Sequence, residues 1–242
     1  MALWRLRGIW SGGSDDLGTL GAFMTPRCFA VVHVVNRDQA VRNTEVAVQL
    51  GFDGVFLISH GLLDWYDLIR VAWPCSLICP YVGVNFLDIE PVEEAVSVAA
   101  DHRLHGAVSR GRFSAVWTDP TYMGPRPVGV EVFSGFAFKG QPQRALADAR
   151  LVQSFCDVLV TSGSATGIGA PIEKVQALRE VLGPEKRLGL ASGVTPENIG
   201  QYMAAGATDF LVATSINYPG TDKIDPARGR QLVDAFRGSS PA

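Results

Sequence analysis

The sequence predicts an α/β fold, a single-domain (β/α)8 TIM barrel, from three observations. Eight short apolar runs occur between residues 27 and 238, and all but one of them are followed by a helix-like segment. The apolar runs are nearly continuous, which is typical of parallel strands that are covered on both faces. The chain has 242 residues, close to the roughly 250 that such a barrel takes. An open, doubly wound sheet is the alternative that the same alternation allows.

Eight apolar runs have the length and the β-branched composition of buried strands. The predicted strands cover residues 28–35, 54–59, 77–87, 112–119, 128–138, 157–163, 187–193 and 209–216. The third is expected to begin late, because Pro80 has no backbone N–H to donate within a sheet.

Segments with a helical spacing of apolar residues follow most of these strands. The predicted helices cover residues 37–52, 62–73, 90–104, 141–156, 171–183, 195–206 and 225–237. Pro74 is expected to end the second helix, because proline cannot continue the hydrogen-bond pattern of a helix. Residues 120–127 read as a loop where a further helix would be expected, so the fourth unit is the least regular.

The composition indicates one domain between two short ends. Hydrophobic residues make up 47% of the chain and charged residues 19%, which fits one sizeable core. Residues 1–26 are Gly-rich and lack a clear period, so we expect a loosely ordered N-terminal extension. Residues 27–238 form the predicted barrel, and residues 239–242 a frayed tail.

Several classes of protein are disfavoured by charge and patterning. The net charge is −3 and no block of Lys and Arg occurs, which argues against a nucleic-acid partner. No run of about 18 uncharged apolar residues occurs, and no signal-peptide core follows Arg5 and Arg7. We therefore expect a cytoplasmic protein without a transmembrane segment. Cys75 and Cys79 are four residues apart without a second pair, so we expect no metal site, and we expect no cofactor.

Small, hydroxyl-rich residues close the last two predicted strands. One strand ends in Ser192-Gly193, and the other ends in Ala213-Thr214-Ser215. Barrels of this kind carry their active sites at the C-terminal strand ends, and often bind phosphate after strands seven and eight. Gly193 would let a ligand approach the backbone; a tight turn without a ligand is the alternative. The predicted ligand-binding residues are Asn85, Thr161, Ser164, Thr166, Ser192, Gly193, Thr214 and Ser215.

Few residues in the expected site could transfer a proton. We take His33, Asp119 and Glu131 as the candidates. Each has a structural alternative: a buried histidine with satisfied hydrogen bonds, a turn cap before Pro120, and a strand carboxylate that has found a partner. Lys139 could bind an anion, although a solvated lysine is commoner, and His60 could be a ligand or the start of a helix.

The stretch SGSATGIG at residues 162–169 resembles a dinucleotide-binding fingerprint. That fingerprint follows the first strand of a short-chain dehydrogenase and is paired with a downstream Tyr-x-x-x-Lys motif. Here the stretch follows the sixth strand and no Tyr-x-x-x-Lys motif occurs. Because a lone glycine motif is weak evidence, we favour a loop over the barrel mouth.

The motifs AVVHVV, VGVNFL, DVLVTSGSATG and LASGVTPENIGQYMAAGATDFLVATSI resemble the BtpA family, which includes SgcQ-like proteins. The resemblance covers residues 29–236 and is strongest over residues 157–215. It implies a barrel of the ribulose-phosphate-binding superfamily, with His33, Asn85, the 161–167 loop and the two hydroxyl-rich strand ends at functional positions. Ala213 departs from the glycine that often stands there in the family, and its methyl group narrows the approach to the backbone.

Two kinds of function remain open at this point. One is an enzyme, or a binding protein, for a phosphorylated sugar or a nucleoside-like small molecule. The other is a non-catalytic assembly factor, since the family is named for a cyanobacterial protein linked to photosystem I biogenesis and a barrel does not by itself imply catalysis. Trp65, Tyr66 and Trp73 lie on one predicted helix and would suit either a homo-oligomer interface or packing on the barrel.

Overall fold

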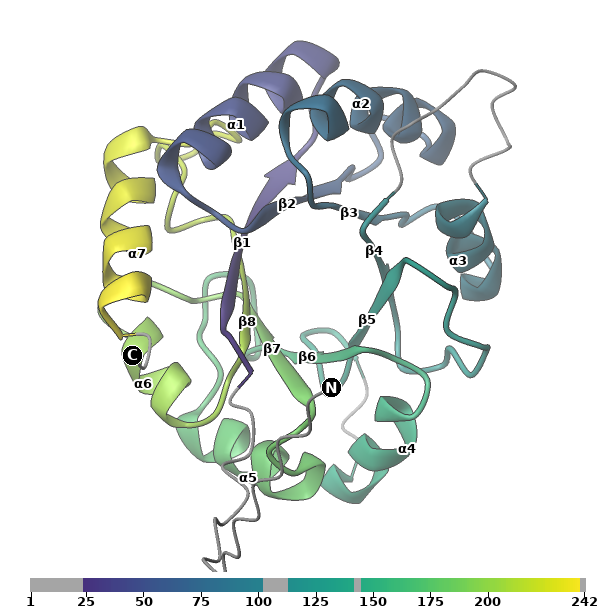
Figure 1. Cartoon of the computed structure of the whole chain (residues 1–242), viewed down its shortest axis with the longest axis vertical. Coiled ribbons are helices and arrows are strands. Elements are labelled where there is room, and N and C mark those ends of the chain that lie inside the picture. The colour runs from purple at the N-terminus through teal and green to yellow at the C-terminus, as the bar shows by residue number, and fades with distance from the viewer. Residues whose placement is uncertain (1–23, 102–112, 142–144, 240–242) are drawn as a thin grey trace, which may run out of the picture.

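A computed structural model describes residues 24–101, 113–141 and 145–239, and its eight strands form a closed parallel barrel in chain order (Figure 1). The strands are β1 (Arg27–His33), β2 (Gly54–Ile58), β3 (Val82–Asn85), β4 (Ala115–Thr118), β5 (Glu131–Gly135), β6 (Val158–Thr161), β7 (Arg187–Ala191) and β8 (Asp209–Val212). Pairing of β1 with β8 closes the ring. The predicted fold class is confirmed, and the open-sheet alternative is excluded.

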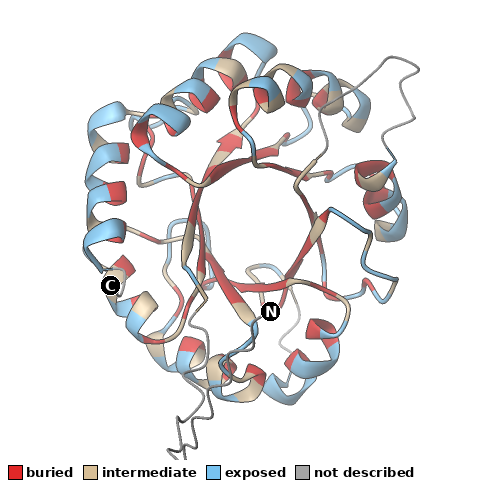
Figure 2. Cartoon of the chain, viewed as in Figure 1, coloured by how far each residue is buried: buried red, intermediate tan, exposed pale blue. Residues whose placement is uncertain are grey.

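Helices surround the ring of strands on its outside (Figure 1). They are α1 (Arg37–Leu50), α2 (Trp65–Ile78), α3 (Val92–Ala100), the 3₁₀ turn η1 (Leu146–Asp148), α4 (Ala149–Gln153), α5 (Ile172–Leu182), α6 (Ile199–Ala204) and α7 (Pro226–Ser239). Their inward faces are buried and their outward faces exposed, while the strands are mostly buried (Figure 2). This burial explains why the strands have nearly continuous apolar sequences.

The prediction that Pro74 ends the second helix is wrong. Helix α2 begins after Asp64, whose side chain accepts a hydrogen bond from the Asp67 N–H, and it continues through Pro74 to Ile78. The turn beyond Pro74 is held because Cys75 is buried and its carbonyl accepts the Cys79 N–H at 2.9 Å. Burial and this hydrogen bond offset the one helix hydrogen bond that proline removes. The third strand accordingly begins only at Val82.

The fourth and fifth units depart most from the predicted pattern. Residues 119–130 form no helix, as the sequence suggested, and lead directly from β4 to β5. The helix predicted over residues 141–156 is much shorter: a 3₁₀ turn precedes α4, which ends at Gln153. The Gln153 side-chain amide donates to the Cys156 carbonyl at 3.0 Å, satisfying a backbone group beyond the helix end.

Aromatic side chains fill the interior of the barrel. Phe29, Phe56 and Phe133 meet edge to face, with ring centroids 4.8 Å apart for Phe56 and Phe133. Such pairs stabilise by about 0.5–1.5 kcal/mol beyond the area that they bury. Gly83 leaves room for the Phe56 ring, because a Cβ at this position would lie 2.5 Å from it. The interior is therefore a packed core, and a ligand can enter only from an end.

A network of charges lies at the N-terminal ends of the strands. Asp209 is fully buried and accepts hydrogen bonds from Arg27 Nε at 2.7 Å and from Arg187 Nη1 at 3.0 Å. Arg27 also pairs with Glu131 at 2.8 Å, and Tyr81 donates to the same carboxylate. Burial alone would lower the pKa of Arg27, but Asp209 and Glu131 more than compensate, so this pKa lies above its usual value. The network joins β1, β5, β7, β8 and Tyr81, the residue before β3, at this end.

The structure describes little of the two predicted terminal segments. Most of the predicted N-terminal extension, residues 1–23, and most of the tail, residues 240–242, lie outside the described residues. Cys28, Cys75, Cys79 and Cys156 are buried free thiols. Among the described residues, no helix combines the length and apolar character that crossing a bilayer requires.

Candidate functional site

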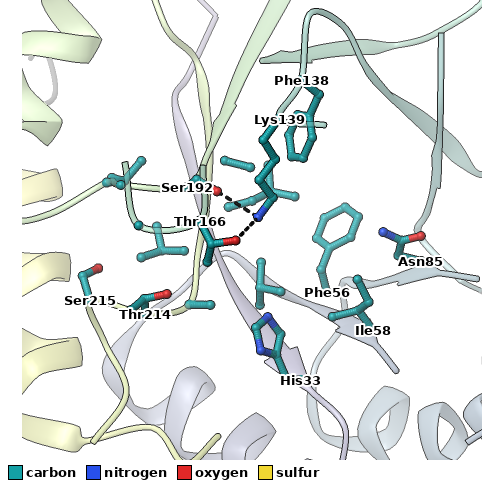
Figure 3. Close-up of a pocket in the computed structure, with 18 of the residues that line it drawn as sticks. His33, Phe56, Ile58, Asn85, Phe138, Lys139, Thr166, Ser192, Thr214 and Ser215 are labelled. Carbon is teal, nitrogen blue, oxygen red and sulfur yellow. Dashed lines mark hydrogen bonds between the residues drawn. The ribbon is translucent and has the colours of Figure 1, made fainter. Parts of the chain in front are cut away.

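A cavity of about 680 Å³ lies at the C-terminal ends of the strands (Figure 3). Its walls come from the residues that close β1, β2, β3, β7 and β8, from the loops after β5 and β6, and from the first turn of α7. The polar residues that line it are His33, His60, Asn85, Lys139, Thr166, Ser192, Thr195, Thr214, Ser215 and Arg228. This is the end of the barrel at which the sequence placed a site.

Aromatic and aliphatic side chains form an apolar wall of the cavity. Phe56 and Ile58 come from β2, and Trp117 and Phe138 pack against each other with ring centroids 5.1 Å apart. Phe56 also belongs to the cluster that fills the barrel interior. The cavity therefore ends on this cluster and does not continue through the barrel.

Gly193 lines the cavity and also packs against the loop after β6. Its φ of +65° lies in the left-handed region, and a Cβ at this position would lie 2.1 Å from the Gly169 backbone nitrogen. The sequence led us to expect that a ligand would approach the backbone at Gly193. The loop after β6 occupies part of that space. Glycine is needed here for both the backbone angle and this close approach.

The end of β8 and the first turn of α7 form one side of the cavity. Thr214 and Ser215 lie together on this side, opposite Asn85 (Figure 3). Ser215 Oγ is buried and has no hydrogen-bond partner within the described part of the chain. Arg228, in the first turn of α7, lines the same cavity and donates from Nη1 to the Asn217 carbonyl at 3.1 Å.

Lys139 extends from the loop after β5 into the middle of the cavity (Figure 3). Its Nζ donates to Thr166 Oγ1 at 2.9 Å and to Ser192 Oγ at 3.2 Å, and so joins the loops after β5, β6 and β7. Nζ also lies 5.8 Å from the centroid of the Phe138 ring. Burial lowers the pKa of Lys139 below its usual value.

His33 is the last residue of β1, and its side chain contacts the carboxylate of Asp222. Its Nδ1 lies 3.3 Å from Asp222 Oδ1, and its ring meets the His60 ring at 5.0 Å. Buried side chains of α1 fix this arrangement, because Gln39 and Asn43 donate to the Asp222 carbonyl at 2.8 and 2.6 Å. A carboxylate only accepts hydrogen bonds, so the proton of the neutral ring belongs on Nδ1, and Nε2 is left as the acceptor.

We expect His33 to be neutral at pH 7. Burial lowers its pKa below 6.5, His60 lowers it further, and Asp222 opposes both. An NMR titration of the ring protons, assigned with His33→Gln, should give a midpoint below 6.5. Asp222→Asn should move this midpoint further down. Because the unfolded chain then binds a proton that the folded chain does not, folding stability should fall as the pH drops below about 6.5. A midpoint above 6.5 would contradict the arrangement.

The structure brings seven of the predicted site residues together and leaves four outside the cavity. Those that line it are His33, Asn85, Thr166, Ser192, Gly193, Thr214 and Ser215. Thr161 is buried at the end of β6, and Ser164 is exposed on the following loop.

Two of the three predicted proton-transfer residues do not reach the cavity. Asp119 is exposed and accepts the Thr121 N–H at 2.7 Å, so it has the capping role that was its alternative. Glu131 is the first residue of β5 and pairs with Arg27 at the opposite end of the barrel. Its carboxylate has the structural partner that was its alternative, and it lies too far from the cavity to transfer a proton there.

Lys139 and His60, which the sequence left open as possible ligand contacts, line the cavity, and so does Arg228, which the sequence did not single out. Lys139 and His60 do follow predicted strands, but a charged residue in such a loop is more often solvated. Arg228 comes from a helix, so the rule that placed the site at strand ends gave no signal for it.

The fold and the site together define a (β/α)8 barrel with a cavity at its C-terminal face. The sequence matches no family model and no curated protein. The BtpA resemblance therefore remains a prediction.

Many solved structures share the fold. One is described as "Native KDPGal structure", with a TM-score of 0.62 and 18% identity over 88% of this chain and 95% of that one. Thiamine phosphate pyrophosphorylase from Pyrococcus furiosus has a TM-score of 0.62 and 10% identity over 88% and 96%. Phosphoribosyl anthranilate isomerase from Thermus thermophilus has a TM-score of 0.60 and 16% identity over 88% of this chain and 98% of that one. At these identities the similarity is one of fold.

Proposed function

We propose that the chain binds a small phosphorylated sugar or nucleoside-like compound in the cavity at its C-terminal face. The observation that carries this proposal is the charge of the lining. Two described lining residues, Lys139 and Arg228, carry basic groups, and none of the described lining residues is Asp or Glu. In a chain of net charge −3 this lining is a local positive region, which favours an anionic ligand.

The phosphate group fits best beside Thr214, Ser215 and Arg228. A guanidinium can donate two parallel hydrogen bonds to phosphate oxygens and keeps its charge at any physiological pH. Thr214 lines the cavity with an exposed side chain, and its hydroxyl group could donate a further hydrogen bond to the phosphate. Barrels of this architecture often bind phosphate at the loops after the last two strands, which supports the same position.

The rest of the ligand would lie against the apolar wall. A cavity of about 680 Å³ falls within the roughly 300–1,000 Å³ typical of small-molecule sites. Phe56 and Trp117 offer ring faces, while Asn85 and His33 offer groups that hydrogen-bond sugar hydroxyls. With Nε2 unprotonated, His33 is the residue best placed to act as a general base.

The comparisons support the ligand class by analogy alone. Two of the barrels with the same fold are named for phosphorylated compounds, thiamine phosphate and phosphoribosyl anthranilate. Fold does not fix function, so the argument rests on the lining of this cavity. The BtpA resemblance belongs to the same proposal, since it implies a superfamily of phosphate-binding barrels.

A non-catalytic role in assembly, as implied for the family's namesake, is the second candidate. The observation that favours it is the scarcity of acid–base groups: no described lining residue carries a carboxylate. A protein with this role would not need to turn over a small ligand. It would be favoured if no phosphorylated compound bound the cavity.

The test is ligand binding by thermal shift and calorimetry with ribose 5-phosphate, glucose 6-phosphate and AMP, each against its unphosphorylated parent. At 100 times its Kd a ligand should stabilise the fold by about 2.7 kcal/mol. Arg228→Gln should weaken binding by about 10- to 100-fold, the loss expected for a hydrogen bond to a charged group. Arg70→Gln is the matched control, because Arg70 is exposed on α2, away from the cavity.

Either of two results would contradict the proposal. One is that no phosphorylated compound stabilises the protein more than its parent does. The other is that Arg228→Gln, folded by circular dichroism, binds as tightly as the unchanged chain.

A further inference from the structure

The cavity holds one of only four lysines in the chain. Of 21 basic residues, the lysines are Lys139, Lys174, Lys186 and Lys223, and the rest are arginines. Arginine is the better residue for a permanent contact with an anion, because its guanidinium group can donate two parallel hydrogen bonds and never loses its proton. Lysine differs in that a buried amine can become neutral and act as a nucleophile. A lysine in the middle of the cavity of an arginine-rich protein therefore indicates a chemical role in addition to its contribution to anion binding.

We propose that Lys139 is the amine nucleophile of the cavity and forms an imine with the carbonyl carbon of a phosphorylated aldehyde or ketone. The inference rests on the proposed function, since the phosphate bound beside Arg228 would place the carbonyl near the amine. It adds to that function a substrate class and a covalent step.

The surroundings of Lys139 suit a neutral amine. No described lining residue carries a carboxylate that would hold the amine as an ammonium ion. The neighbouring side chains are two hydroxyl groups and the Phe138 ring. Burial lowers the pKa of Lys139, which raises the fraction of free amine at neutral pH.

The two hydroxyl groups also suit the proton transfers of imine formation. The Nζ lone pair attacks the carbonyl carbon, the C=O π electrons move to oxygen, and that oxygen takes a proton to give a carbinolamine. The nitrogen gives up both of its protons to this oxygen, the first in forming the carbinolamine and the second in converting its hydroxyl group to water. The nitrogen lone pair forms the C=N bond as the C–O bond breaks and the water leaves. Thr166 Oγ1 and Ser192 Oγ, at 2.9 and 3.2 Å from Nζ, can pass these protons on. The step consumes one amine and one carbonyl, releases one water, and needs no oxidant or reductant.

Lys174 provides an internal comparison. Its Nζ donates to the carbonyls of Ala137 and Ser162 at 2.7 and 2.8 Å, below the loops that carry Lys139. Both partners are backbone acceptors, and Lys174 does not line the cavity. Its burial lowers its pKa as well, so a depressed pKa alone does not distinguish the two lysines. The two lysines differ in their access to the cavity, which Lys139 lines and Lys174 does not.

The experiment is borohydride trapping with glycolaldehyde phosphate at pH 7, read by intact mass and peptide mapping. Reduction of the imine adds the mass of the aldehyde minus one oxygen atom. We expect the adduct mainly on Lys139, with at least a ten-fold loss in Lys139→Arg and no loss in Lys186→Arg. Lys186 is exposed just before β7, at the other end of the barrel. Unphosphorylated glycolaldehyde should label Lys139 at least ten-fold less.

Adducts spread evenly over the four lysines, or labelling that survives Lys139→Arg, would overturn the imine. This failure is separable from that of the proposed function. Stabilisation by ribose 5-phosphate without selective labelling of Lys139 would leave phosphate binding intact and remove the covalent step.

Discussion

Asp209→Asn is expected to lower the free energy of unfolding by about 3–5 kcal/mol, the cost of removing one partner from a buried ion pair. Asp209 is fully buried between Arg27 and Arg187, and it also accepts the Thr208 hydroxyl at 2.7 Å. The asparagine side chain has nearly the same shape but carries no charge. Both guanidiniums would then face each other with only Glu131 left to compensate for one of them.

Urea unfolding followed by far-UV circular dichroism gives the measurement. The matched control is Asp67→Asn, because Asp67 faces Arg70 across an exposed pair 3.6 Å apart on α2. Exposed pairs of this kind contribute about 0–0.5 kcal/mol. If both variants lost less than about 1 kcal/mol, the network at the N-terminal end would not be holding the barrel closed.

Gly193→Ala is expected to lower the free energy of unfolding by about 2–6 kcal/mol, since left-handed strain and steric overlap each cost about 1–3 kcal/mol. The added Cβ would lie 2.1 Å from the Gly169 nitrogen, a backbone atom that can move only with its loop. The loop after β6 would be pushed away, and with it Thr166, one of the two acceptors of Lys139. Binding of the phosphorylated ligand should therefore weaken together with stability.

Gly167→Ala separates strain from overlap. Gly167 lies on the same loop with a φ of +78°, but a Cβ there would meet nothing within 4 Å. Only the backbone strain remains, about 1–2 kcal/mol. Urea unfolding and binding of ribose 5-phosphate should be measured on both variants. Equal losses would mean that the contact between the two loops contributes nothing.

The barrel and the position of its mouth could be predicted from the sequence because both depend on local signals. Alternating apolar runs and helices specify parallel strands, and parallel strands bring their C-terminal ends to one face. Ser192, Thr214 and Ser215 were found in this way, from their position at strand ends alone. His33 followed from the same rule.

The remaining residues depend on register and on tertiary packing, which the sequence does not show. The strand predicted from residue 128 begins only at Glu131, because residues 128–129 form a turn in which Gly129 has a φ of +82°. The predicted strand started three residues too early, so Glu131 was placed inside the strand. In the structure it is the first residue of β5 and lies at the end of the barrel opposite the cavity. Arg228 reaches the cavity from a helix, and only the folded chain brings that helix beside β8.

The contact of α1 with Asp222 joins parts of the chain that are far apart in sequence. Gln39 lies 183 positions before Asp222, and Asn43 lies 179 before it. The histidine side of the cavity is thus completed by a segment far downstream in the sequence, and it forms only when that segment packs against α1. Ligand binding in the cavity should consequently require a closed ring of strands. A chain that stops before β8 would lack a complete binding site.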